Sequence, residues 1–347
     1  MATGSWISLT DLTSRMDGAG KQAYIAEMLS QSTALLRDMP FIEGSEIFGH
    51  QFVFRNSIPA GSWRYLNRGT GYSKSTTGKS TIGMATLTGY SQIDKLLATG
   101  SGNVAEFRKN EDIAFIEGMG QTVERTAWYG NTATNPAEFM GLSTFYNTLT
   151  VGNAQNAQNV INGGGAGNDN SSIWLVCWGE RTITGVYPRG SRVGLNSDDL
   201  ADTRPAYDSL GNPYEAWTTY FEHNLGLCPM DWRQAVRIAN IDVTNAGLAG
   251  PDALDLFVAM SQMVMAPPVL SKETSGITES DSPNGDPGIR PVIYCNRTVR
   301  FWMDVQGMRD RNVLISLQEA PGKVQDLFRG IPVKVSDQLL ITEGTVT

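Results

Sequence analysis

The 347-residue chain contains two histidines, His50 and His223, whose imidazole groups are suited to acid–base catalysis near neutral pH. His50 stands at the start of an expected strand, and His223 ends an expected hairpin. A serine hydrolase needs such a base beside a nucleophile on a Gly-x-Ser-x-Gly turn, and this motif does not occur. We therefore expect neither histidine to be catalytic and the protein not to be an enzyme.

Two glycine-containing segments resemble phosphate-binding loops, and both depart from the required pattern. Gly78-Lys79-Ser80 matches the end of a P-loop, but Ser73 occupies the place of the first glycine, and the residues that follow do not begin a helix. The glycines at 163–165 and 167 lack the third position of a dinucleotide fingerprint. We interpret the second segment as an exposed flexible loop and expect no nucleotide cofactor.

Possible metal ligands are few and poorly spaced. Asp198, Asp199 and Asp202 form a small acidic cluster, which we interpret as solvated. Residues 281–286 faintly resemble a calcium loop, but the spacing is wrong and Val292 occupies the place of the bidentate glutamate. The cysteines are far apart and surrounded by apolar residues, so we expect buried free thiols at Cys177, Cys228 and Cys295. The sequence predicts no metal site.

Eight tryptophans are spread evenly along the chain. Tryptophan beside carboxylate pairs is typical of surfaces that bind or cleave sugars, so a glycan-directed enzyme or carbohydrate-binding module stays open as an alternative. Most of these residues fall on expected strands or helix stripes, where core packing is the default. The eight tryptophans are Trp6, Trp63, Trp128, Trp174, Trp178, Trp217, Trp232 and Trp302.

The composition is neutral and polar, because charged residues make up 18% of the chain, where about 25% is usual. A net charge of −8 argues against a surface that binds nucleic acid by neutralising phosphates. There is no run of 18 apolar residues for a membrane span, and the first residues do not resemble a secretory signal. The 37 glycines have no three-residue period, which excludes collagen.

The first third of the chain predicts elements with little core of their own. The apolar spacing over 8–40 predicts helix ending at Pro40. Residues 51–55 predict a strand, 56–61 a turn and 63–66 the returning strand, followed by an extended loop up to Gly83. Such a long loop is uncommon inside a compact domain and is usually functional or mobile.

The pattern from Asn103 to Gly130 predicts one long helix, about 37 Å in length, with Gly130 as its C-cap. Its expected apolar stripe consists of Ala105, Ile113, Ile116, Met119, Val123 and Ala127. The remainder predicts a mixed α+β arrangement. Strands are expected at 172–187, 207–223, 232–241 (half-buried), 292–295, 331–335 and 339–341, helices at 251–265 and 298–309, and loops at 151–172 and 272–289.

Four phrases of the sequence resemble, in order, the major capsid protein of tailed bacteriophages. They are 63–69 (Trp-Arg-Tyr-Leu-Asn-x-Gly) with 73–77 (Ser-Lys-Ser-Thr-Thr), 129–131 (Tyr-Gly-Asn), 135–142 (Asn-Pro-x-x-Phe-x-Gly-Leu) and 231–242 (Asp-Trp-Arg-x-x-Val-Arg-Ile-Ala-Asn-Ile-Asp). The phrases have no catalytic meaning and are specific only as a family signature. Together they span nearly the whole chain.

The resemblance implies the α+β capsid fold shared with herpesvirus capsid proteins. It implies an N-terminal arm (1–45), an extended hairpin loop (46–87) and a peripheral domain (88–150) containing a spine helix (103–130). An axial domain with returning peripheral strands (151–325) and C-terminal peripheral strands (326–347) complete the expected order. A thin arm and a long hairpin are expected to gain their burial from neighbouring subunits.

The resemblance also implies a structural, self-assembling protein of the virion, made in the host cytoplasm. Hexamers and pentamers would tile an icosahedral head around double-stranded DNA, without sequence-specific binding and without a membrane. A separate scaffolding protein is expected because the chain begins with the arm, and portal and decoration proteins are possible partners. Lys74 and Lys79 are candidates for a covalent cross-link such as some relatives make, but we expect solvated or salt-bridged lysines instead. The expected inter-subunit contacts are Trp63, Arg64, Leu66, Lys74, Ser75, Thr76 and Thr77.

Overall fold

The computed structural model describes residues 31, 33–208, 210–244, 254–267, 289–309, 315–320 and 323–347. Three expectations fall wholly or partly outside these ranges. They are most of the arm helix, the start of the helix expected at 251, and the loop at 272–289 with its calcium-like segment. Of the arm, the structure describes α2 (Ala34–Asp38), which ends before Pro40 as expected.

Within the described residues, twelve strands join into one mixed sheet, and two more form a separate ribbon. The main path runs β12-β13-β14-β11-β6-β7-β9-β4, with β1 beside β7, β10 between β5 and β6, and β8 beside β9. Its strands are β1 (Phe41–Glu43), β4 (Ala85–Asp94), β5 (Val160–Asn162), β6 (Asn170–Trp178), β7 (Ile183–Tyr187), β8 (Leu195–Tyr207), β9 (Pro213–Pro229), β10 (Ala235–Asp242), β11 (Arg290–Cys295), β12 (Ile315–Ala320), β13 (Lys323–Phe328) and β14 (Ile331–Val335).

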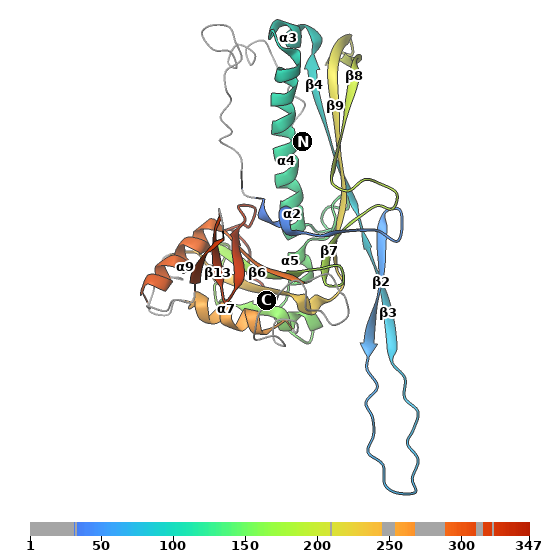
Figure 1. Cartoon of the computed structure of the whole chain (residues 1–347), viewed down its shortest axis with the longest axis vertical. Helices are drawn as coiled ribbons and strands as arrows, with labels where there is room; N and C mark the ends of the chain where they lie inside the picture. The colour runs from blue at the N-terminus through green and yellow to red at the C-terminus, as the bar shows by residue number, and fades with distance from the viewer. Residues whose placement is uncertain are drawn as a thin grey trace.

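Helices lie on both sides of the central strands (Figure 1). Every residue of β6 is buried, because its alternate side chains enter two different cores. Ile173, Leu175 and Cys177 pack with α7 and α9, whereas Trp174 and Trp178 pack with the end of α4. The helical segments are α3 (Lys95–Gly100), α4 (Val104–Tyr129), α5 (Leu142–Phe145), α7 (Leu256–Met265), α9 (Arg297–Arg309) and the short 3-10 turns η1 (Gln155–Asn159) and η2 (Trp232–Gln234).

The long helix α4 confirms the expected spine within one residue at each end. The Asn103 side chain accepts a hydrogen bond from the Glu106 backbone N–H, and Gly130 follows as the C-cap. The apolar stripe was partly wrong, because Ile113 and Ile116 keep 41% and 45% of their surface exposed, while Phe107 is buried. The middle turns of the helix instead face the sheet through Phe115, which stacks on Phe221 of β9, and Met119, which lies beside Gly89 of β4.

Two strand predictions need correction. The segment expected as a half-buried strand at 232–241 begins with η2 and continues as β10, which is buried on both faces. Its polar Arg237 is buried because it pairs with Glu343, a partner that no local pattern reveals. The expected strand at 339–341 is irregular, because Leu339 turns into the core and the Leu340 backbone N–H donates to the Tyr129 hydroxyl instead of to a strand.

Candidate intersubunit surface

A two-stranded ribbon projects away from the body of the protein (Figure 1). It consists of β2 (Gly49–Ser57) and β3 (Thr76–Gly83), which pair antiparallel from Gly49 opposite Gly83 to Ser57 opposite Thr76. The returning strand was therefore predicted at the wrong place. Residues 63–66 are not a strand, because the pairing partner of β2 begins at 76 and the intervening chain meets no second layer.

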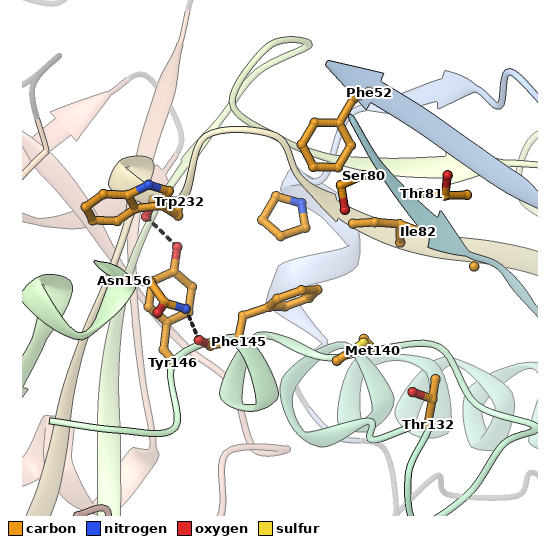
Figure 2. Close-up of a pocket in the computed structure, with 12 residues that line it drawn as sticks. Phe52, Ser80, Thr81, Ile82, Thr132, Met140, Phe145, Tyr146, Asn156 and Trp232 are labelled. Atoms are coloured by element: carbon orange, nitrogen blue, oxygen red, sulfur yellow. Dashed lines mark hydrogen bonds between the residues drawn. The ribbon is translucent and has the colours of Figure 1, made fainter. Parts of the chain in front are cut away.

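The root of the ribbon rests on a small apolar cluster. Ile82 is buried with Val186 and Cys228, and Phe52 packs against them. A cavity of about 400 Å³ lies beside this contact, between the ribbon, the 140–146 segment and η2. In Figure 2, Phe52 and Ile82 lie on one side of this cavity and Phe145 on the other. The ribbon is thus held at one end, on one side.

The tip of the ribbon, residues 58–75, carries apolar and aromatic side chains that contact almost nothing. Trp63 is fully exposed, and Leu66 keeps 90% of its surface. An isolated two-stranded hairpin is at best marginally stable in water, and clustered exposed apolar side chains mark an interaction surface. The large exposed apolar residues of the ribbon and tip are Val53, Phe54, Ile58, Trp63, Tyr65, Leu66 and Tyr72.

A short turn shapes the far end of the tip. The Arg68 backbone N–H donates to the Tyr65 carbonyl at 3.2 Å, and Arg64 Nη1 donates to the Arg68 carbonyl at 3.4 Å. Asn67 adopts the left-handed conformation that closes the turn, with φ of 63°. We call residues 64–68 the tip turn; it holds two guanidinium groups on one bend of chain.

The ribbon and tip are basic, a feature that the sequence contained and our prediction missed. Residues 49–83 include five cationic and no acidic side chains, although the whole chain has a net charge of −8. Among the described residues, none of the five forms an ion pair. The cations are Arg55, Arg64, Arg68, Lys74 and Lys79. Counting charge by segment, instead of over the chain, would have found this signal.

The seven expected contact residues all belong to the tip or to the start of β3. Trp63, Leu66 and Lys74 are exposed, and the Thr76 hydroxyl lies 2.7 Å from that of Ser57, where the two strands begin to pair. The structure brings these residues together on one projection. Within the part of the chain that the structure describes, no hydrogen bond or ion pair joins them to the body of the same chain.

Several of the residues that the sequence offered for catalysis, phosphate binding or metal binding lie within strands or in the buried core. Both histidines lie in strands, and burial lowers the pKa of His50 and of His223, which favours neutral imidazoles at pH 7. Gly78-Lys79-Ser80 lies within β3, so no helix follows it. Asp198 lies within β8 instead of in the expected loop. All three cysteines are buried free thiols, as expected, and burial raises each thiol pKa to about 12.

Most of the tryptophans that the structure describes lie in a core or pack against one, and Trp6 is outside the described residues. Trp128, Trp174 and Trp178 are completely buried, and the rings of Trp128 and Trp174 lie 5.7 Å apart. Across the ranges that the structure describes, no group of three or more His, Cys, Asp or Glu side chains is placed to hold a metal ion. No helix in the described part of the chain has the length and apolarity needed to cross a membrane.

A mixed α+β body with a long helix, a large mixed sheet and a projecting ribbon defines a class of protein, the subunits that build phage shells. The structure is similar to that of bacteriophage Epsilon15, with 28% identity over 100% of this chain and 99% of that chain, and a TM-score of 0.75. The capsid of bacteriophage JBD30, decorated with minor capsid protein trimers, shares the fold at 10% identity, 96% and 100% coverage and a TM-score of 0.50.

The family follows from the sequence itself. Residues 17–347 match the family model of the major capsid protein GP7, and the chain belongs to this family. No curated protein matches it. The protein is thus a major capsid protein of a tailed bacteriophage, a structural protein that forms the icosahedral shell of the virion. The resemblance predicted from the four sequence phrases, and the α+β capsid fold that it implied, are confirmed.

Proposed function

We propose that the ribbon and its tip join neighbouring copies of this chain into hexamers and pentamers, which close into a shell around double-stranded DNA. The observation that carries the proposal is the exposed tip, where Trp63 and Leu66 project from a ribbon that the body supports at one end only. A contact between the tip and a different patch on the next copy is heterologous, and such contacts close into rings.

The seven tip residues named from the sequence would form this contact. Trp63 and Leu66 would supply apolar area, because burying each of them contributes roughly 2–3 kcal/mol. Arg64 and Lys74 would supply charge pairing. Lys74 and Lys79 are both exposed, and their main contribution would be the positive charge of the ribbon and tip. Both would also be accessible for a covalent cross-link.

The expected division of the chain fits the packing and stays a proposal. The arm would comprise residues 1–45, of which β1 pairs with β7 of the same chain, and the loop (46–87) would contain the ribbon. The peripheral domain (88–150) would contain α4, and the axial domain (151–325) the strands around β6. The C-terminal segment (326–347) would return to the periphery, because Glu343 hydrogen-bonds with Tyr129 at the end of α4.

Several partners follow from the proposed assembly. A separate scaffolding protein, a portal and decoration proteins would be partners of the shell. DNA would be enclosed without sequence-specific contacts, which suits a subunit with a net charge of −8. Synthesis in the host cytoplasm would precede assembly, and the shell would need no catalysis by the subunit.

Deleting the tip tests the proposal. Replacing residues 58–75 with a two-residue Asn-Gly turn joins β2 directly to β3 and removes the exposed apolar side chains. We expect a folded subunit with an unchanged thermal unfolding midpoint that forms no rings or shells by electron microscopy. A matched control, Val151→Ser, removes an exposed apolar side chain from another turn and should leave assembly intact. Normal shells from the deletion variant would contradict the proposal.

A further inference from the structure

The strands β8, β9 and β4 extend beyond the central sheet beside α4 (Figure 1). One face of this extension is covered by the helix. The rings of Phe115 and Phe221 stack at 6.0 Å, and the Arg108 guanidinium lies 5.0 Å from the Trp217 ring. Because side chains alternate along a strand, the neighbours of Phe221 in β9 must point to the opposite, outer face.

Four side chains on that outer face make one continuous patch. Tyr90 of β4 and Asp198 of β8 both lie opposite Tyr220 of β9, and Glu222 is two residues further along β9. The Tyr90 and Tyr220 rings lie 4.8 Å apart, and the Tyr220 hydroxyl donates to Glu222 at 2.9 Å. We call Tyr90, Asp198, Tyr220 and Glu222 the tyrosine face; Tyr90 keeps 63% of its surface exposed.

The tyrosine face contains two acidic side chains, Asp198 and Glu222. The hydrogen bond to Glu222 is the largest cause that raises the pKa of the Tyr220 hydroxyl, burial adds to it, and the charges of Glu222 and Asp198 raise it further. The strand register also places Arg204 on this side of the sheet, opposite Ala216, which lies four residues before Tyr220 in β9. A guanidinium group stacks on aromatic rings and pairs with carboxylates, so two rings beside two carboxylates suit it.

The complementary charge lies at the other end of the same molecule. The ribbon and tip together have five cations and no acid, and the tip turn presents Arg64 and Arg68 together. The ribbon and the sheet extension point to opposite ends of the longest axis (Figure 1). The tip of one chain therefore cannot reach its own tyrosine face, whereas the tip of a second copy can.

We propose that the tyrosine face receives the tip turn of a second copy. This rests on the proposed function and adds the receiving surface and its chemistry. Each guanidinium stacks on a tyrosine ring and pairs with a neighbouring carboxylate, while Trp63 and Leu66 cover the edge of the contact. Because both sites occur once in each chain and at opposite ends, repeated pairing produces a head-to-tail series that closes into a ring.

A charge exchange tests the pairing. The tip variant carries Arg64→Glu and Arg68→Glu, and the face variant carries Asp198→Lys and Glu222→Lys. We expect each to lower the yield of sedimentable rings and shells by about tenfold or more, because like charges now meet at the contact. The variant with all four substitutions restores opposite charges and should recover most of the assembly. A control, Glu180→Lys, reverses an exposed acid in the β6–β7 turn and should assemble normally.

Two further measurements keep the outcome clear. Thermal unfolding of each unassembled variant verifies the fold, and Tyr90→Ala tests the face without changing charge and should also weaken assembly. If the face variants assemble like the parent, or if the fourfold variant recovers nothing, the tyrosine face does not receive the tip. Loss of assembly on deleting residues 58–75 together with intact assembly of the face variants would overturn this inference and leave the proposed function standing.

Discussion

Arg237 of β10 and Glu343 near the C-terminus form a buried ion pair, with Nη2 and Oε2 2.7 Å apart and both side chains 5% exposed. Glu343 also accepts hydrogen bonds from the Tyr129 hydroxyl and the Ser172 hydroxyl, each at 2.5 Å. Arg237 donates in addition to Ser172 Oγ and to the Tyr146 carbonyl. The last residues of the chain are thereby fixed to the end of α4 and to the central sheet.

Breaking this pair should destabilise the subunit strongly. Glu343→Gln leaves the Arg237 guanidinium buried without its counter-charge, and such a loss typically costs about 3–5 kcal/mol. Urea unfolding of the unassembled subunit measures the change. Asp337→Asn serves as the control, because its partner Arg297 is 75% exposed, and a surface pair of this kind contributes under about 1 kcal/mol. Equal effects of the two substitutions would contradict the prediction.

Two tryptophans should separate assembly from stability. Trp63→Ala removes a fully exposed ring, so we expect a change in unfolding free energy within about 0.5 kcal/mol and a loss of shells. Trp128→Ala empties a completely buried site and should cost about 3–5 kcal/mol. Urea unfolding and electron microscopy of the same samples give both readouts. A destabilised Trp63 variant would show that the tip already packs within its own chain.

Glu124 should make the stability of the subunit depend on pH. It is fully buried between α2, α4 and the segment after β14, and its carboxyl group accepts a hydrogen bond from the Ser336 hydroxyl. Burial is the largest cause that raises its pKa from 4.5 to about 7, the hydrogen bond from Ser336 lowers it, and nearby Asp337 raises it. The folded protein therefore binds this proton more tightly than the unfolded chain does.

The sign of the effect follows from that raised pKa. The contribution of Glu124 is fully present below about pH 4.5 and is lost as the pH rises through about 7, with a span on the order of 3 kcal/mol. Glu124→Gln stays neutral, so its stability relative to the parent should increase between pH 5 and pH 8 in urea titrations. Glu106→Gln, on the exposed first turn of α4, is the control. Parallel pH profiles for parent and Glu124→Gln would refute the assignment.

The three cysteines should be unreactive in the folded subunit. Each thiol is buried and has a pKa of about 12, so almost no thiolate forms at pH 8. We expect a disulfide reagent to label none of Cys177, Cys228 and Cys295 in the native protein. It should label all three once the protein is unfolded in about 6 M guanidinium. Rapid labelling of native protein would place at least one thiol at the surface.

Local patterns predicted the elements whose determinants are close in sequence. The spine helix was predicted within a residue because Asn103 and Gly130 are its own caps. The hairpin around 210–212 and the helix at 298–309 were also confirmed, since turn residues and apolar spacing specify them locally. The order of these elements, with the four family phrases, was enough to identify the fold and the structural role.

The remaining features depend on partners distant in the chain. Arg237 looked like an exposed strand residue, because its partner Glu343 lies 106 positions away. The return strand of the ribbon was misplaced at 63–66, because pairing of β2 with 76–83 is decided by register between segments and not by the local apolar run.

Sequence alone thus determined the spine helix and several other elements, the family, and the positive charge of the ribbon and tip. Only the tertiary structure decided that this charge lies at one end of the molecule and the tyrosine face at the other. Side-chain type is a property of single positions, whereas the relative placement of Arg64 and Tyr220 depends on how the sheet, α4 and the ribbon pack together.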